Sequence, residues 1–344
     1  MLRFPSDILD SLCRRHCSFA LYCLPGGSDV HFCMAKDGRT EAGLAEGFVI
    51  STFEGETCTI PDELDELPQP DLFDELPTEA MPQETTRERY EHTFRYFHSL
   101  LTSPRSALKK IVLARTHYVA GPRLSAAKAF AQALQNTPQA FNVLIHTPQW
   151  GTWLFSTPEL LLQSTEQGWE TMALAGTRPQ DTATPWDKKN VEEQSIVADF
   201  IRHTLQQYAS HIQEGELSTL CGSSVEHLCT HFRFEMKEEH LPMLLAELPP
   251  TPAVSGYPVS LARNLLQQHP DIPRQCYAGF LGSCKNNSTH LFVALRGMKI
   301  VPGGALLYAG GGIMPDSDVQ AEWEETQAKM HAMLRILHQT AAGY

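Results

Sequence analysis

The segment AEWEETQAKMHAML (residues 321–334) places charged side chains at spacings that could support chemistry. Glu322, Glu325 and Lys329 are three and four residues apart, so a helix presents them on one face. An ordinary explanation is a surface ion pair between Glu325 and Lys329, which stabilises a helix by about 0.3–0.5 kcal/mol. The other explanation is that the carboxylates hold a ligand or cation, and the remaining charged positions bear on that choice.

Four further charged residues occupy unexpected positions, three of them within apolar segments. Glu159 lies in TPELLL, which reads as an otherwise apolar strand, and Glu193 stands near the start of a predicted helix, where a carboxylate also favours the helix itself. Lys110 enters the apolar strand KIVLAR, and Arg296 sits inside LFVALRGMKI. A charge inside an apolar strand is costly unless it is paired, so we expect these side chains to have partners or to face a cleft. Lys109 and Lys110 point to opposite faces of an extended strand, so one of them is free to face solvent.

Strand and helix patterns surround these positions. A stripe of Tyr90, Phe94, Phe97 and Leu101 predicts a helix after Pro82. Further helices are predicted over residues 125–136, 187–208, 260–270 and 318–342; strands are predicted within 16–60 and over 109–120, 169–179, 225–236, 276–284, 289–301 and 305–314, with a hairpin over 140–164 that turns near Gly151. We therefore predict an α/β chain of the α+β type, with large antiparallel β-sheets and helices packed on the outside.

An acidic, proline-rich stretch at about residues 61–86 has no Lys or Arg before its end and is predicted to be a surface loop. It follows a strand-rich lead-in, so we divide the chain into residues 1–84 and 85–344. The two parts are expected to pack as one compact unit. An acidic interaction segment is the other reading of this stretch.

Composition narrows the possible functions. The formal charge of -13 disfavours nucleic-acid binding, which needs clustered Lys and Arg. Nine cysteines without a CxxC spacing predict reduced thiols in a cytoplasmic protein. Neither a secretory leader nor an apolar run of about 18 residues is evident, so no membrane association is expected. Nucleotide-loop and nucleophile-elbow motifs are absent, and His227 and His231 lack the glutamate of a zinc helix.

Ten segments, taken in order, resemble the chorismate-binding family, which includes anthranilate synthase large subunits, aminodeoxychorismate synthases, isochorismate synthases and salicylate synthases. The resemblance runs from about residue 85 to the end of the chain. The segments are KIVLAR, TPELLL, LAGT, KNVEEQSIV, EHLCTHF, PPTPAVSGYP, YAGFLG, VALRGMKI, LYAGGGI and EWEETQAKMHAML. The resemblance implies the chorismate-utilising enzyme fold, with the active site in a cleft between the sheet layers.

Two positions distinguish the branches of this family. Lys110 at the head of its strand resembles the branch that adds water to the ring, and the turn SGYPVS lacks the lysine of the aminodeoxychorismate branch. The form PTPAVSGYP is most similar to isochorismate synthases. A salicylate synthase, which goes on to eliminate pyruvate, shares the lysine and is the alternative.

The resemblance implies water attack at C2 of chorismate with loss of the C4 hydroxyl. Lys110 would be the base and must be neutral when it acts, whereas Glu159 would be the acid and must be protonated. Burial in apolar surroundings favours a protonated carboxyl. Each residue must therefore be held in the protonation state opposite to its usual one, with Lys110 neutral and Glu159 protonated.

The family pattern also implies a metal and a set of substrate contacts. Mg2+ would be bound by Glu193 and Glu325, with Glu322 close by, since hard carboxylate ligands suit this ion. Arg296 and Lys329 would hold carboxylates of the substrate. The rest of the expected pocket comprises Ala175, Gly176, Thr177, His227, Tyr277 and the backbone of Gly310, Gly311 and Gly312.

One departure and two open points remain. The family helix usually reads Glu-His where this chain has Glu193-Gln194, which affects only the surroundings of the metal ligand. Isochorismate feeds both menaquinone and catechol siderophore synthesis, and the compact chain favours menaquinone. We expect a monomer whose one partner is the small-molecule substrate.

Overall fold

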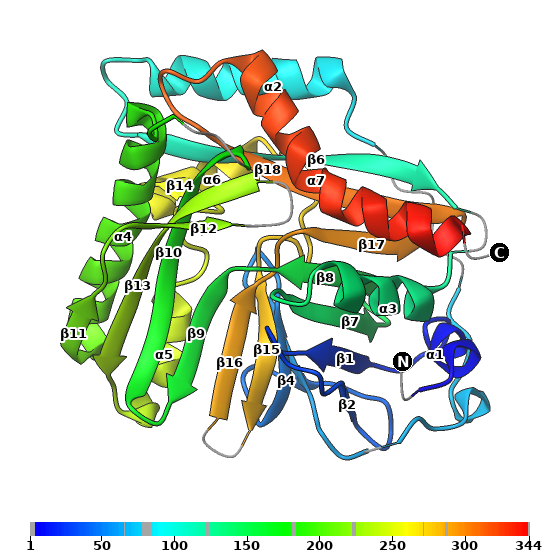
Figure 1. Ribbon diagram of the computed structural model, residues 1–344. Helices are drawn as coiled ribbons and strands as arrows, with labels where there is room; N and C mark the ends of the chain where they lie inside the picture. Colours follow the sequence, from blue (N-terminus) through cyan, green and yellow to red (C-terminus); the bar gives the residue numbers. More distant parts are fainter. Residues whose placement is uncertain are drawn as a thin grey trace.

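The structure is a computed structural model that describes residues 4–64, 66–77, 84–121, 124–180, 184–221, 225–270, 272–285 and 288–342. Two large antiparallel sheets make up most of it, and helices cover their outer surfaces (Figure 1). In Figure 1 the strands of the first sheet run across the view and those of the second run up and down. The predicted fold class is therefore confirmed.

The first sheet has eight strands, in the spatial order β14 (Gly256–Tyr257), β6 (Lys110–Ala120), β18 (Gly304–Ile313), β17 (Gly297–Val301), β8 (Gly151–Thr157), β7 (Phe141–Thr147), β1 (Phe19–Cys23) and β2 (His31–Met34). Its associated helices are α1 (Ser6–Leu12), α2 (Arg87–Leu101), α3 (Ala126–Asn136), α6 (Val259–Gln268) and α7 (Val319–Ala342). The long helix α7 lies along β18 and α3 (Figure 1).

The second sheet has ten strands, in the order β11 (Ser210–Glu214), β13 (Val225–Glu235), β10 (Gly168–Pro179), β9 (Leu160–Thr165), β16 (Ser288–Val293), β15 (Phe280–Lys285), β4 (Gly47–Ser51), β5 (Thr57–Ile60) and β3 (Glu41–Ala42), with β12 (Ser218–Cys221) beside β13. Helix α4 (Lys188–Tyr208) packs on β10 and β13, and α5 (Leu241–Glu247) packs on α4. Two short 3-10 turns occur at Pro70–Leu72 and Glu238–His240.

Three of the predicted helices begin where the sequence offers a capping side chain. Thr86, Ser125 and Asp187 each accept a hydrogen bond from a backbone amide in the first turn of α2, α3 and α4. All five predicted helices are present, whereas the seven-residue helices α1 and α5 were not predicted. Among the described residues, no helix combines the length and apolar character needed to cross a membrane.

The N-terminal strands are shared between the two sheets. β1 and β2 extend the first sheet beyond β7, while β3, β4 and β5 extend the second beyond β15. The described part of the acidic stretch is tied to this region, because Arg15 lies 3.1 Å from Asp71 and 3.7 Å from Glu75. Residues 65 and 78–83 of the predicted loop lie outside the described residues.

Two segments that were predicted to be continuous strands are not, because each is divided between the two sheets. Residues 289–301 form β16 in the second sheet and β17 in the first, and Arg296 lies at the break with a positive φ of 50°. The hairpin of β7 and β8 turns before Gly151 as predicted, but the chain then crosses to β9. Glu159 therefore lies on this crossing rather than on an apolar strand.

The two crossings run side by side. The amide of Ser156 donates to the carbonyl of Arg296 at 3.0 Å, and the amide of Val293 donates to the carbonyl of Glu159 at 3.0 Å. A pair of neighbouring chain segments thus passes from one sheet to the other as a unit. These bonds hold the acidic and the basic crossing residue in one place.

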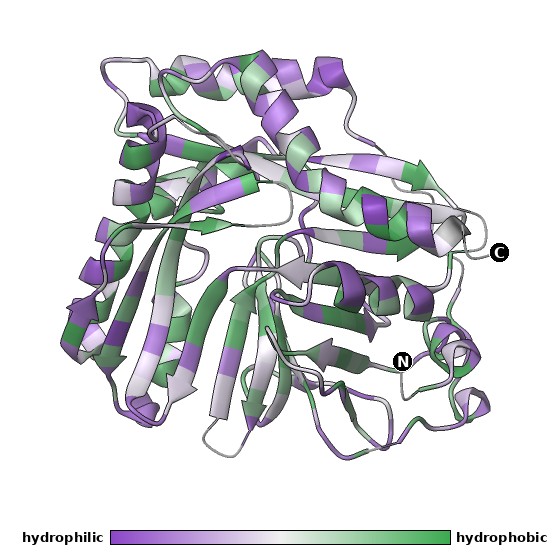
Figure 2. Ribbon diagram, in the orientation of Figure 1, coloured by the Kyte–Doolittle hydropathy of each residue, from purple (hydrophilic) through white to green (hydrophobic). Residues whose placement is uncertain are grey.

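Apolar side chains from both sheets fill the space between them. Phe141 of the first sheet stacks on Phe292 of the second, with ring centroids 4.2 Å apart and planes 7° from parallel. Figure 2 shows hydrophobic residues along the strands and many hydrophilic residues on the outer helices. A second core lies between the first sheet and helices α1, α3 and α7, where Phe130 and Met333 are buried.

Candidate active site

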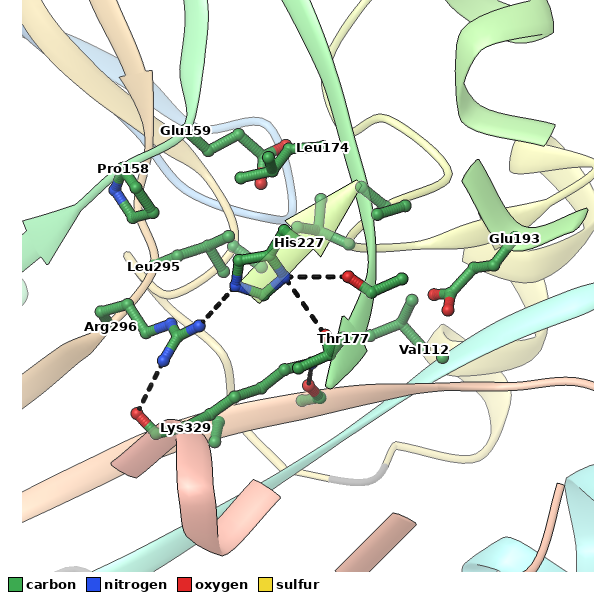
Figure 3. A pocket seen from close by; sticks show the side chains of 18 of the residues that line it. Val112, Pro158, Glu159, Leu174, Thr177, Glu193, His227, Leu295, Arg296 and Lys329 are labelled. Carbon is green, nitrogen blue, oxygen red and sulfur yellow. Dashed lines mark hydrogen bonds between the residues drawn. The ribbon is translucent and has the colours of Figure 1, made fainter. Parts of the chain in front are cut away.

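One pocket collects most of the residues predicted from the sequence (Figure 3). Its lining includes Glu159, Ala175, Gly176, Thr177, Glu193, His227, Tyr277, Arg296, Gly310, Gly312 and Lys329. Lys110, Gly311, Glu322 and Glu325 do not line it. They contact lining residues or their immediate neighbours, as described below.

The pocket draws its walls from both sheets. β6 and β18 contribute from the first sheet, β10 and β13 from the second, and the two crossings contribute Glu159 and Arg296. Pro158, His227 and Arg296 also line a wider neighbouring groove. These three residues therefore stand where the pocket meets the groove.

Strand β18 has an open edge at the pocket. β17 pairs with β18 only as far as Tyr308, so among the described strands the glycines that follow pair with β6 alone. Lys329 of α7 reaches this edge, where its ammonium donates to the carbonyl of Gly310 at 2.9 Å. Backbone polar groups at a sheet edge are available to a ligand, as expected for an anion site.

The glycines of β18 leave room for acidic side chains. A Cβ on Gly312 would collide with Glu193 Oε1 and would lie 2.8 Å from Lys110 Cε. A Cβ on Gly311 would lie 2.8 Å from Glu322 Oε2, on the α7 side of the strand. Successive residues of a strand face opposite sides, so Gly312 belongs to the pocket and Gly311 to the helix.

His227 and Arg296 form a buried hydrogen-bonded network (Figure 3). Arg296 Nη2 donates to His227 Nε2 at 2.7 Å, and Nη1 donates to the carbonyl of Lys329 at 3.3 Å. Since guanidinium can only donate, His227 Nε2 accepts, and its Nδ1–H is left to donate to the carbonyl of Gly176 at 3.0 Å. Burial, followed by the charges of Arg296 and Lys329, lowers the pKa of His227 well below its usual value.

The LAGT segment lies within β10, where the register with β13 shifts at Gly176, and it packs against the start of α4. Gly176 has a φ of 74°, a left-handed conformation that glycine adopts without strain. The amide of Thr177 donates to Asn190 Oδ1 at 2.9 Å. This bond joins the pocket wall of β10 to the helix that carries Glu193.

Glu159 and Glu193 are both in the pocket lining, and their environments shift their pKa values in opposite directions. Burial raises the pKa of Glu159 to about 8, although Lys110, Lys329 and Arg296 oppose this. Burial also acts on Glu193, but the charge and hydrogen bond of Lys110 prevail and lower its pKa. Near neutral pH, Glu159 can therefore hold a proton while Glu193 is ionised.

Each predicted metal ligand is paired with a lysine. Lys110 Nζ lies 2.9 Å from Glu193 Oε1, and the Lys110 side chain is fully buried while Lys109 is exposed, as the strand geometry predicts. The remaining two pairs join Lys329 to Glu325 at 2.6 Å and Lys189 to Glu322 at 2.5 Å. The three carboxylates are thus neutralised one for one.

Lys189, Ser317 and Gln194 were not predicted as site residues. Lys189 lies one helical turn before Glu193, and this spacing was a signal that could have found it. Ser317 Oγ donates to Glu322 Oε1 at 2.7 Å, a contact that sequence spacing does not reveal. Gln194 is buried and donates to the carbonyl of Ala173 and to Thr230 Oγ1, so it anchors α4 to the second sheet.

The chemistry of the donors fits a hard divalent cation. Among the described residues, no three His, Cys, Asp or Glu side chains are grouped as metal ligands would be. However, Glu322 is 1% exposed, and its Oε2 has no hydrogen-bond partner among the residues that the structure describes. A buried, unpartnered carboxylate oxygen is costly, and a cation would satisfy it.

Comparisons with known proteins agree with the geometry. A profile described as "Chorismate binding enzyme" matches residues 58–338. Isochorismate synthase MenF of Escherichia coli is 30% identical over 242 residues, which cover 67% of this chain and 56% of MenF. Isochorismate synthase 2 of Arabidopsis thaliana is 29% identical over 257 residues, which cover 71% of this chain and 46% of the relative. The chain thus spans about half the length of these curated relatives.

Solved structures show the same fold. The structure of MenF from Escherichia coli superposes with a TM-score of 0.77 at 20% identity, over 96% of this chain and 91% of that one. Anthranilate synthase component I from Streptococcus pneumoniae superposes with a TM-score of 0.62 at 18% identity, over 97% and 86% of the two chains. The N-terminal strands are therefore part of the shared architecture.

We predict that Glu159→Gln changes how stability depends on pH. With its pKa raised from 4.5 to about 8, folded Glu159 keeps a proton that the unfolded chain has lost, so wild-type stability falls as pH rises through this window. Glutamine cannot ionise, so the variant should gain stability relative to wild type by up to about 1.4 kcal/mol per pH unit. Urea unfolding between pH 5 and 8 measures this.

Exposed Glu88→Gln is the matched control, whose stability should follow wild type across the same range. Parallel stability curves for Glu159→Gln and wild type would show that Glu159 is ionised in the folded protein throughout.

Proposed function

As the chain belongs to the chorismate binding enzyme family, we propose that it is an isochorismate synthase, which converts chorismate to isochorismate. The observation that carries this proposal is the presence of a buried lysine and a carboxyl with a raised pKa at one pocket. Figure 3 places Glu159 and Glu193, the partner of Lys110, on different sides of that pocket. A site that only bound chorismate would need neither group.

The reaction exchanges one hydroxyl for another. Water attacks C2 of the ring, the double bonds shift, and the C4 hydroxyl leaves as water. Lys110 would take the proton from the attacking water, and Glu159 would give its proton to the departing hydroxyl. One water enters and one leaves, so the product is an isomer of the substrate.

Glu159 and Lys110 differ in how well their surroundings in the structure suit these proposed roles. Glu159 fits its role directly, because burial keeps the proton on its carboxyl near neutral pH. Lys110 is bound to Glu193 in an ion pair, and an ammonium is not a base. Lys110 must therefore lose a proton before its amine can accept one from the attacking water.

Cationic side chains would hold the two carboxylates of chorismate. Arg296 already has its guanidinium fixed by His227 and by the carbonyl of Lys329, so it presents a rigid fork to an anion. Lys329 and the backbone groups at the edge of Gly310 and Gly312 provide a second anion site. Tyr277, buried beside Tyr308, would contact the pyruvyl arm.

Mg2+ is the proposed cofactor, with Glu193 and Glu325 as ligands and Glu322 close by. When bound, it would supply positive charge that offsets the ring carboxylate of the substrate. Glu193 and Glu325, now paired with Lys110 and Lys329, would hold the ion. The all-oxygen donor set supports Mg2+ over softer metals.

We propose that the product enters menaquinone synthesis, since MenF of Escherichia coli, which is 30% identical to this chain, is the menaquinone-specific isochorismate synthase. Disruption of the gene in its host should then lower the menaquinone content of lipid extracts. A normal menaquinone content with loss of a catechol siderophore would assign the other route.

The direct test incubates the purified protein with chorismate and Mg2+ and follows the ring protons by NMR. Isochorismate should accumulate to an equilibrium mixture, and a chelator should stop the reaction. Salicylate as the main product, seen by its fluorescence without an added lyase, would identify a salicylate synthase. Chorismate binding without turnover would identify a binding subunit.

We predict that Lys110→Gln lowers kcat by about 100-fold or more, the range that general-base catalysis contributes. The neighbouring Lys109→Gln is the matched control, because Lys109 is exposed and should leave kcat unchanged. Circular dichroism should show that both variants are folded. Turnover of Lys110→Gln at the wild-type rate would remove Lys110 from the mechanism.

A further inference from the structure

Only one of the two carboxylate oxygens of Glu322 accepts hydrogen bonds from the described residues. Oε1 accepts from Lys189 Nζ at 2.5 Å and from Ser317 Oγ at 2.7 Å. Ser317 is fixed in turn, since its Oγ accepts from the amide of Met314 at 3.0 Å. Oε2 is buried, has no hydrogen-bond partner and lies over Gly311. Exchange of the two oxygens by rotation would break both bonds to Oε1.

Lys189 makes this arrangement possible from another helix. It stands in the first turn of α4, four residues before Glu193, and reaches across to Glu322 on α7. Its ammonium donates to Oε1 of Glu322, so the contact joins α4 to α7 at the carboxylate.

The position of the ammonium decides whether Lys189 assists or blocks a cation. Its side chain is 27% exposed and contacts Oε1 of a carboxylate that is itself 1% exposed. Among the described residues no hydrogen-bond donor contacts Oε2, whereas Lys189 holds Oε1. Lys189 therefore orients the carboxylate through one oxygen and leaves the other without a donor.

We propose that Lys189 is a positioning residue for the divalent cation: it clamps Oε1 of Glu322 across the two helices and leaves Oε2 as the single oxygen available to the ion. This inference rests on the proposed function, in which Glu322 belongs to the cation site. Partners that orient a metal ligand typically change metal affinity by about 10–100-fold when they are removed.

The test is calorimetric titration of Mg2+ into metal-free protein at fixed ionic strength. Lys189→Met should bind Mg2+ about 10–100-fold more weakly than wild type. Lys189→Arg keeps a cationic donor and should restore most of the affinity, and exposed Lys188→Met should match wild type. Ser317→Ala removes the other anchor and should show a smaller loss, which keeps the test decisive if Lys189→Met does not fold.

Unfolding midpoints in a chelator separate a loss of Mg2+ affinity from a general loss of structure. Equal Mg2+ affinity in Lys189→Met and wild type overturns the inference, and tighter binding overturns it by showing that Lys189 competes with the ion. A wild-type protein that binds no Mg2+ also overturns it. Failure of the proposed function is recognised separately, by the absence of isochorismate from the wild-type NMR assay.

Discussion

The position of the pocket is determined by two neighbouring segments that cross between the sheets, one from β8 to β9 and the other from β16 to β17. Paired hydrogen bonds between Ser156 and Arg296, and between Val293 and Glu159, carry both segments across together. At this point the backbone belongs fully to neither sheet, so side chains fill the gap between layers. One crossing brings a carboxyl and the other a guanidinium, which sets the acid and the anion-binding group within one cavity.

The site gathers cationic side chains although the whole chain is acidic. The protein carries a net charge of -13, yet Lys110, Lys189, Lys329 and Arg296 gather at this site. Burial favours the protonated form of both Glu159 and Glu193, and the two differ in the distance to a cation. Glu193 has an ion-pair partner at 2.9 Å, while the cations act on Glu159 only through space. Equal side chains thus acquire opposite protonation states.

Sequence patterns predicted the helices and the hairpin, because capping residues and apolar stripes are local signals. They missed the crossings, since LFVALRGMKI is apolar on both sides of the break and hydropathy does not report a change of sheet. Spacing and charge singled out the acidic and basic residues of the site, and the resemblance supplied their roles and the remaining pocket residues. The pairing of Lys189 with Glu322 lay beyond either method, because it joins two helices 133 residues apart.

Gly310, Gly311 and Gly312 of β18 restrict which substitutions this part of the chain can accept. Every missense change of a glycine codon adds at least a Cβ. At Gly312 that atom would meet Glu193 and Lys110, at Gly311 it would meet Glu322, and at Gly310 it would lie 3.3 Å from Tyr277 Oη. Any replacement would therefore displace a side chain of the site: Glu193 or Lys110 at Gly312, Glu322 at Gly311, and Tyr277 at Gly310. Sequence change along this stretch is thus coupled to the positions of the site's side chains, even though none of the three glycines has a reactive group.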